Sequence, residues 1–422
     1  MADHLVRTTD ARNLCRSTAP SIPPHDPTPG SSHLAVAGRI VAGPQSVATI
    51  GPSPLLCPPG RLILSQMNRR QIFQLLGLGA AATATVAGTR TAMAGNHYYD
   101  GPPSDHFDGT RFFNPGGIEP RPFTDVLRWR FGGGGERAVW PERVASPFPA
   151  AVPDARIEDL RLTMVGHATL LVQVAGLNIL TDPVWSERVS PVSFLGPRRV
   201  VEPGIAFERL PKIDLVLLSH NHYDHLDVET LARLKAKHDP LVVMPLGNDC
   251  IVLDAVPGMR LQVGDWGDRI ETPDAVIHVE PAHHWSARGL RDRRMALWAA
   301  FVVETAAGRI YHIGDTGFHE GINYRAAAAK HGDFRLAILP IGAYEPRWFM
   351  AGQHQGPEDA VAGMVLAKAQ YAAGHHWSTF QLTDEPIDEP GRLLAETLRQ
   401  RGIARERFRP MLPGEVWDVP KA

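Results

Sequence analysis

The chain has 422 residues, and its 43 basic and 45 acidic side chains leave a formal net charge of -2. This balance argues against a nucleic-acid binder, which needs clustered positive charge, so no nucleic-acid partner is expected. A hydrophobic content of 44% is ordinary for a globular protein with a core. Only three cysteines are present, which excludes a structural zinc site built on several thiolates.

Residues 1–66 contain proline pairs and glycine–serine stretches, and no helical or strand period persists in them. Such a segment buries too little apolar surface to offset the entropy of ordering, so we predict that it is disordered. Because Met67 opens a segment of a different kind, our hypothesis is that residues 1–66 are an upstream over-extension of the reading frame.

Residues 67–94 have the pattern of an export signal. Arg69 and Arg70 are followed by an aromatic residue and the apolar tract 72–88, and the segment ends in the small-residue motif A-M-A at 92–94. The paired arginines resemble a twin-arginine signal, which exports folded proteins. We therefore predict a periplasmic protein; a cytoplasmic or signal-anchored protein is the alternative.

Residues 95–156 are irregular and rich in aromatic side chains. We predict an N-terminal extension that wraps the core and contains a short helix near 123–129. Its aromatic residues are expected to pack against the body of the domain, with a lipid-facing role as the alternative.

From residue 157 to 422 the patterning is regular. Apolar runs separated by turn residues predict strands at 162–165, 168–174, 177–180, 213–218, 241–245, 261–263, 276–279, 297–304, 309–313 and 336–340. Helices are predicted after the N-cap Asp227, near 320–331, at 357–368 and at 390–401. Strands with helices between them indicate an α/β domain with large sheets covered by helices.

A cluster of polar residues follows the predicted strand 213–218. His220, His222, Asp224 and His225 lie within six residues. An apolar run that ends in such a cluster predicts a buried strand that delivers a loop. Imidazole nitrogens and carboxylate oxygens are the ligands that zinc selects. A histidine-rich surface loop is the alternative, but H-x-H-x-D-H after a buried strand favours a metal site.

Three later turns also carry metal-binding side chains; two follow the predicted strands 276–279 and 309–313, and the third follows the run near Ala372. They are the doublet at 283–284, Asp315 between glycines at 314 and 317, and the doublet at 375–376. One carboxylate can bridge two ions, and two ions about 3.5–4 Å apart can acidify a shared water. Spacing alone does not decide which histidine of each doublet is the ligand, and each turn taken singly could instead be a helix cap.

The order H-x-H-x-D-H, His, Asp, His resembles the metallo-β-lactamase superfamily over roughly residues 96–420. The strings T-D-P at 181–183, P-A-H-H-W at 281–285, G-D-T-G at 314–317 and I-G-A-Y-E-P-R-W-F-M at 341–350 are similar to the N-acyl-phosphatidylethanolamine-hydrolysing phospholipase D branch. The resemblance implies an α/β fold of four layers, an αβ/βα sandwich.

The resemblance also implies the ligands of two zinc ions. One ion would be held by His220, His222 and His284. The other would be held by Asp224, His225 and His376, with Asp315 bridging the two. In this branch the ligand precedes tryptophan, which selects the second histidine of each doublet and leaves His283 and His375 behind the ligands or facing solvent.

Further site residues follow from the same resemblance. Asp182 is expected to orient the ligands or the attacking water. Gln353 and His354 match residues near the substrate phosphate, and His354 could donate to a phosphoryl oxygen or to the leaving group. With Asp224, these three make up the predicted catalytic set. Tyr344 and Arg347 are predicted to bind substrate, with loop packing as the alternative.

The predicted activity is that of a zinc-dependent phosphodiesterase, in which a metal-bridging hydroxide cleaves (N-acyl)phospholipids in a phospholipase D-like reaction. The expected partner is a lipid or other small-molecule substrate, with peripheral membrane contact as an option. The alternatives are a lactonase or a sugar-phosphate or nucleotide hydrolase of the same superfamily, and a catalytically silent metal-binding protein. The sequence does not indicate the oligomeric state.

Overall fold

The computed structural model describes residues 95–132 and 137–421. The predicted disorder of residues 1–66 and the predicted signal at 67–94 lie outside the described residues. Among the helices of the described part, none is long and apolar enough to cross a bilayer.

The described residues form two seven-stranded mixed sheets. The first sheet has the order β14 (Val416–Asp418), β1 (Leu160–Gly166), β2 (Thr169–Val174), β3 (Leu177–Thr181), β4 (Leu215–Leu217), β5 (Leu241–Pro245), β6 (Arg260–Gly264). The second sheet has the order β13 (Phe408–Pro410), β12 (Ala369–His375), β11 (Phe334–Pro340), β10 (Gly308–His312), β9 (Ala300–Thr305), β8 (Val276–Glu280), β7 (Arg269–Glu271). Strands β3 to β6 are parallel, as are β10 to β13, and the remaining pairs are antiparallel.

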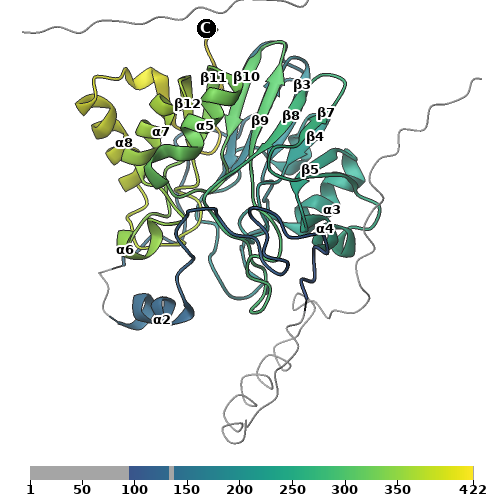
Figure 1. The fold of residues 1–422 in the computed structure, drawn as a ribbon. Coiled ribbons are helices and arrows are strands. Elements are labelled where there is room, and N and C mark those ends of the chain that lie inside the picture. Colours follow the sequence, from purple (N-terminus) through teal and green to yellow (C-terminus); the bar gives the residue numbers. More distant parts are fainter. Residues whose placement is uncertain (1–94, 133–136, 422) are drawn as a thin grey trace, which may run out of the picture. The chain divides into compact units, whose positions relative to one another are not determined.

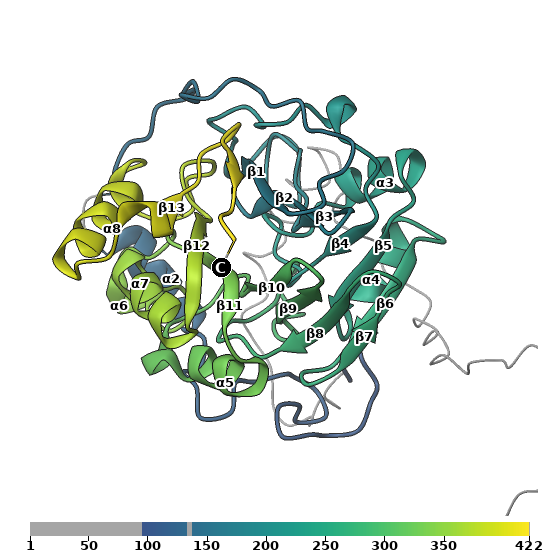
Figure 2. The same ribbon diagram turned by 90° about the horizontal axis from the view of Figure 1, so that it is seen from above.

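Helices cover the outer face of each sheet, as Figures 1 and 2 show. Helices α3 (Val228–Lys237) and α4 (Asn248–Ala255) lie on the first sheet. Helices α5 (Ile322–His331), α7 (Pro357–Leu366) and α8 (Glu389–Gln400) lie on the second. Between the sheets is a buried layer that includes Leu162, Phe301 and Ile338. The predicted four-layer α/β sandwich is therefore confirmed.

The strand predicted at 297–304 begins only at Ala300. The preceding backbone hydrogen-bonds across to the first sheet instead of pairing within the second. The Leu297 N–H donates to the carbonyl of Leu246 at 2.8 Å, and the Ala299 N–H donates to the carbonyl of Ser219 at 2.9 Å. These two hydrogen bonds connect the first sheet, including the segment that carries the histidine cluster, to the second sheet.

Asp227 caps α3 and also anchors a neighbouring loop. One carboxylate oxygen accepts from the N–H groups of Glu229 and Thr230 at 3.1 and 3.2 Å. The other accepts from the N–H of Ser186 at 3.0 Å, from a loop that follows β3. Because the side chain is only 7% exposed, its loss would leave several donors without a partner.

We expect Asp227→Ala to lower the free energy of unfolding by about 1–3 kcal/mol, from the lost cap and the stranded donors. Asp388 is a matched control, because it occupies the N-cap of α8 without a side-chain capping bond and lies exposed beside Arg392. Asp388→Ala should change stability by less than about 0.5 kcal/mol. Denaturant unfolding measures both, and equal losses would contradict this account.

In its described residues, 95–132 and 137–156, the N-terminal arm carries the helix α2 (Phe123–Phe131) and contacts both halves of the domain. Asn96 donates to the carbonyl of Met295 at 2.7 Å, and the N–H of Ala151 donates to the carbonyl of Gly204 at 2.7 Å. Asn114 donates to the carbonyl of His284 at 3.0 Å. The arm therefore supports a segment that carries a predicted metal ligand.

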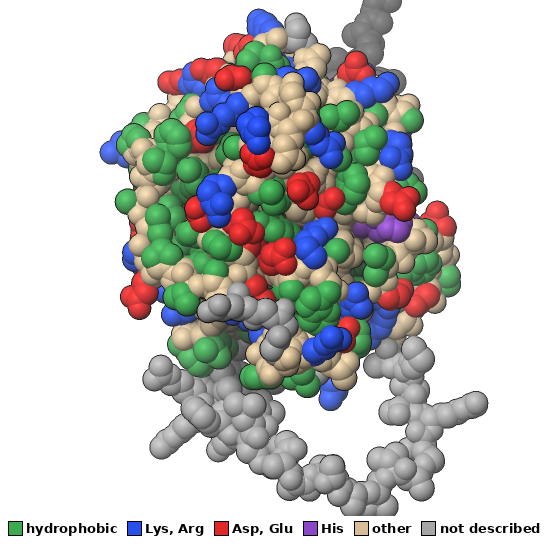
Figure 3. Space-filling view, turned by 90° about the vertical axis from the view of Figure 1, so that its left-hand side faces the viewer, with side chains coloured by type: hydrophobic (Ala, Val, Ile, Leu, Met, Phe, Trp, Pro, Cys, Tyr) green, Lys and Arg blue, Asp and Glu red, His purple; other side chains and the backbone are tan. Residues whose placement is uncertain are grey.

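On the face that Figure 3 shows, basic and acidic side chains are intermixed.

Candidate metal centre

The predicted ligands come from both sheets and follow the ends of strands. His220, His222, Asp224 and His225 follow β4 in the first sheet, whereas His284, Asp315 and His376 follow β8, β10 and β12 in the second. Parallel strands bring their carboxyl ends to one edge of a sheet, which is where ligands bind in open α/β sheets. All seven side chains meet at this edge.

His220, His222 and His284 form the first group of converging nitrogens. His222 Nδ1 lies 2.8 Å from His220 Nε2 and 3.2 Å from His284 Nε2. Nitrogens that share a tetrahedral zinc ion at 2.0–2.1 Å are separated by about 3.3 Å. The spacing of these three nitrogens therefore suits one zinc-sized ion.

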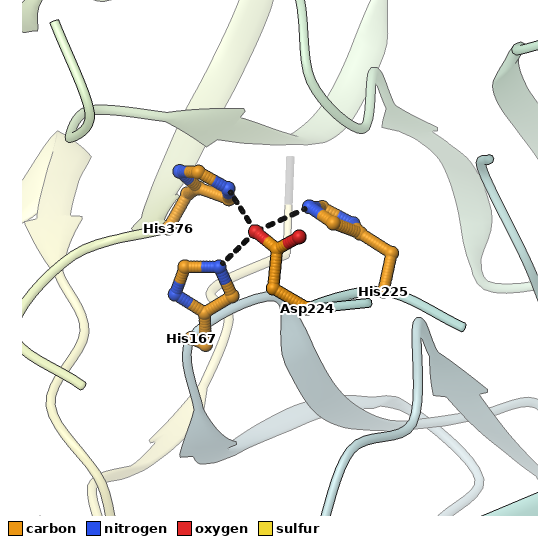
Figure 4. A group of neighbouring side chains, drawn as sticks. All are labelled: His167, Asp224, His225 and His376. Carbon is orange, nitrogen blue, oxygen red and sulfur yellow. Dashed lines mark hydrogen bonds and ion pairs between the residues drawn. The ribbon is translucent and has the colours of Figure 1, made fainter. Parts of the chain in front are cut away.

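The second group is formed by Asp224, His225 and His376, together with His167, which the sequence analysis did not single out (Figure 4). Asp224 Oδ2 lies 3.3 Å from His376 Nε2 and 3.5 Å from His225 Nε2. Imidazole and carboxylate donors at these separations suit a second ion.

Asp315 lies between the two groups. Its Oδ2 is 3.0 Å from His376 Nε2 and 3.3 Å from His225 Nε2, and it is 3.8 Å from His284 Nε2 in the first group. The turn before Asp315 needs Gly314, which has φ +65°, because a Cβ there would lie 2.7 Å from the Cβ of Ser219. Asp315 therefore reaches both groups through a close approach of the two sheets.

Hydrogen bonds to the far nitrogen fix the tautomer of three histidines. His225 Nδ1 lies 2.9 Å from Asp182 Oδ2, His284 Nδ1 lies 3.0 Å from the carbonyl oxygen of Gln353, and His220 Nδ1 lies 3.0 Å from Ser219 Oγ. The carboxylate of Asp182 and the carbonyl of Gln353 can only accept an N–H. Ser219 Oγ also accepts one, because its own hydroxyl donates to Asp182 at 2.8 Å. The Nε2 atom of each ring is then left with a lone pair that faces the centre.

Burial and mutual charge shift the pKa values in opposite directions. Burial holds the pKa of His220 and His284 well below the usual range. Burial alone would raise the pKa of Asp315, but the imidazoles of His376 and His225 outweigh it and hold the pKa well below normal. For His376, burial is outweighed by Asp315 and Asp224, so its pKa rises to about 9. The neutral imidazoles of His220 and His284 and the ionised carboxylate of Asp315 are donors that fit divalent cations.

The structure separates the two histidine doublets. His284 and His376 lie in the converging groups. His283 turns to Asn323, with its Nδ1 3.0 Å from the amide nitrogen, and stacks on another histidine outside the groups. His375 is fully buried beside His312, with ring centroids 5.5 Å apart, so it does not face solvent.

The carboxylate of Asp182 contacts His225 and the residue before the cluster, Ser219. It is fully buried, has φ +35°, and accepts from the N–H of Ser219 at 2.7 Å as well as from His225. Of the two roles predicted for it, the geometry favours orientation of the ligands.

The segment after β11 carries the predicted substrate residues. His354 lies beside the centre, with Nδ1 3.8 Å from Asp315 Oδ2, and burial lowers its pKa to about 4. Its carbonyl accepts from Arg347 at 3.1 Å, and Arg347 is itself paired with Asp359 at 2.9 Å. Gln353 contributes its backbone carbonyl to His284. Arg347 and Gln353 therefore act through neighbouring residues in this structure.

Tyr344 is buried, and its hydroxyl donates to Glu389 of α8 at 2.7 Å. This contact favours the packing alternative for Tyr344 over substrate binding.

Three supporting residues escaped the sequence analysis. His167 lies in the β1–β2 turn, Ser219 precedes the cluster, and Arg288 fastens the cluster loop by donating to the carbonyls of Asn221 and Leu226 at 3.0 and 2.8 Å. A polar residue in a tight turn between apolar strands was the available signal for His167. Arg288 has no local signal, since its partners are distant in sequence.

Comparisons with known proteins agree with this architecture. A Beta-lactamase superfamily domain model matches residues 177–377. Over 268 residues the chain is 36% identical to N-acyl-phosphatidylethanolamine-hydrolyzing phospholipase D 1 of Caenorhabditis elegans, covering 61% of this chain and 75% of that protein. It is 32% identical to the mitochondrial N-acyl-phosphatidylethanolamine-hydrolyzing phospholipase D of Saccharomyces cerevisiae, covering 58% of this chain and 53% of that protein.

Among solved structures, Igni18, a metallo hydrolase from the archaeon Ignicoccus hospitalis, matches with a TM-score of 0.45 and 21% identity, covering 62% of this chain and 99% of that chain. The family assignment rests on the 36% identity to the Caenorhabditis elegans relative and on the 75% of that protein that the match covers. The chain belongs to the metallo-β-lactamase superfamily of metal-dependent hydrolases, in the branch that includes the N-acyl-phosphatidylethanolamine-hydrolysing phospholipases D.

Proposed function

We propose that this protein is a dizinc phosphodiesterase that cleaves phospholipids, with N-acylated phospholipids as the leading substrate class, in a phospholipase D-like reaction. The observation that carries the proposal is the position of Asp315, whose Oδ2 lies within 3.8 Å of imidazole nitrogens from both groups. A shared carboxylate is the arrangement that a two-ion hydrolytic centre needs. The names of the relatives support the choice of substrate class.

In this proposal each ion has its own set of donors. His220, His222 and His284 would hold one, Asp224, His225 and His376 would hold the other, and Asp315 would touch both. Such a pair, when bound, supplies hydroxide near neutral pH and offsets the charge of phosphoryl oxygens.

The chain's own residues position the reactants. Asp182 and the carbonyl of Gln353 keep the ligand rings oriented, so the centre is rigid before substrate arrives. His354, whose imidazole is neutral and whose backbone carbonyl accepts from Arg347, donates a hydrogen bond to a phosphoryl oxygen. A water oxygen forms the new bond to phosphorus, the bond from phosphorus to the alcohol oxygen breaks, and the alcohol takes up a proton that the water loses.

The test is a substrate screen with the purified full-length protein, coupled to metal analysis. We expect about two zinc ions per chain, hydrolysis of N-acyl-phosphatidylethanolamine in mixed vesicles to the alcohol and a phosphatidic acid, loss of activity with a chelator, and recovery with zinc. Cyclic nucleotides and lactones serve as competing substrates. Cleavage of lactones without any phosphodiester would overturn the substrate class and leave the metal centre standing.

A further inference from the structure

Hydrogen bonds from its backbone to a neighbouring segment hold His167 in place. It lies in the turn between β1 and β2, is 1% exposed, and has φ +55°, which an L residue with a bulky side chain rarely adopts. Its N–H donates to Thr379 Oγ1 at 2.8 Å, and its carbonyl accepts from the N–H of His376 at 2.9 Å. The turn is therefore fastened to the segment that supplies the last predicted ligand.

The ring of His167 is confined by its neighbours. Its centroid lies 4.1 Å from that of His376 and 5.2 Å from that of Phe380, which approaches edge-on. Little space remains for the ring to rotate in a close-packed interior. Its Nε2 consequently points at Asp224, as Figure 4 shows.

Three imidazole nitrogens approach Asp224 Oδ2, and they are not equivalent. His167 Nε2 is the nearest, at 2.9 Å, followed by His376 Nε2 at 3.3 Å and His225 Nε2 at 3.5 Å. Because His225 gives its N–H to Asp182, its Nε2 presents a lone pair, which repels a carboxylate oxygen unless a cation lies between them. His167 stands at the ordinary distance of an N–H···O hydrogen bond, with no need for a cation between the atoms.

We propose that His167 is a positioning residue that donates an Nε2–H hydrogen bond to Asp224 Oδ2 and thereby aims this carboxylate at the second ion; the inference rests on the proposed two-ion centre. The bond occupies one lone pair of Oδ2 and leaves the other for the ion. The bond also fixes the rotamer of the Asp224 side chain, which lies on the loop after β4. His167 thus serves Asp224 as Asp182 serves His225.

The alternative is that His167 is itself a ligand of the second ion, since its Nε2 belongs to the same converging group. Two amide substitutions separate these roles. The amide N–H of glutamine can reach the place of histidine Nε2, whereas that of asparagine reaches only the place of Nδ1. Among residues other than glycine, asparagine is one of those that best tolerate a left-handed backbone, so a defect in His167→Asn would not stem from the turn.

The experiment uses full-length protein with His167→Gln, His167→Asn and His167→Ala. Zinc retention is titrated with a chromophoric chelator, and the visible absorption of the cobalt-substituted protein reports the geometry at the second site. We expect His167→Ala and His167→Asn to hold the second ion about 10–100-fold more weakly. His167→Gln should retain parental affinity and the parental cobalt spectrum.

Equal loss in all three variants would make His167 a ligand and overturn the proposal, as would full retention by His167→Ala and His167→Asn. If His167→Ala fails to fold, the comparison of glutamine with asparagine still decides. No substrate enters this measurement. A parent that binds two ions but cleaves no phosphodiester would therefore refute the proposed activity without touching this inference.

Discussion

Asp315→Asn is expected to abolish turnover, with a loss well above the ~10–100-fold typical of residues that stand behind a metal ligand. Asparagine keeps the shape of the side chain but removes the negative charge that faces the imidazoles of His225, His376 and His284. Without that charge, the two ions would repel each other more strongly, because the shared carboxylate no longer offsets their charges. The bound zinc per chain should fall together with kcat.

Metal analysis and steady-state kinetics with the substrate found in the screen measure this effect. Asp274→Asn is the matched control, since Asp274 is exposed in the turn before β8 and the same charge is removed there. It should retain full metal content and activity. An Asp315→Asn variant with two bound ions and parental kcat would contradict the role of Asp315 as the shared carboxylate on which the proposal rests.

Asp182 is expected to show the largest effect on stability. Its carboxylate is fully buried and takes hydrogen bonds from the N–H and hydroxyl of Ser219 and from His225. Asp182→Ala would strand these groups in the interior, and we expect it to lower the free energy of unfolding by about 3–5 kcal/mol. Denaturant unfolding measures the loss.

Asp182→Asn separates this stabilising role from control of the tautomer. Asparagine can still accept from Ser219, but its NH2 group would face His225 Nδ1 and favour the tautomer with the proton on Nε2, the atom that faces the second ion. We expect milder destabilisation than in Asp182→Ala, together with zinc affinity at the second site about 10–100-fold below the parent. Unchanged zinc retention in Asp182→Asn would show that Asp182 is structural only.

The sequence was most informative where a local pattern carries the structure. Apolar runs separated by turn residues predicted β1 to β3, and the position of Asp227 before an amphipathic segment predicted the start of α3. The cluster His220–His225 was recognised because polar residues directly follow a buried strand. The choice of His284 and His376 from their doublets came from the family resemblance, and the structure places both in the converging groups.

Other features could not be predicted, for physical reasons. Strands β7, β13 and β14 have three residues each, too few to display alternation. Helix α4 begins at a left-handed glycine and has no side-chain cap to mark its start. The tautomer-fixing bonds join residues far apart in the chain, such as His284 and Gln353, so only the fold brings them together.

The position of β14 beside β1 has a consequence for synthesis. Strand β1 begins at Leu160, yet its outer neighbour is Val416–Asp418, whose backbone pairs with it in antiparallel register. A nascent chain on the ribosome therefore leaves that edge of β1 unpaired until its C-terminal part emerges, and an open edge is a template for pairing with another chain. His376 also emerges late, after β1 to β6 have been translated, so the second group of donors is complete only near the end of synthesis.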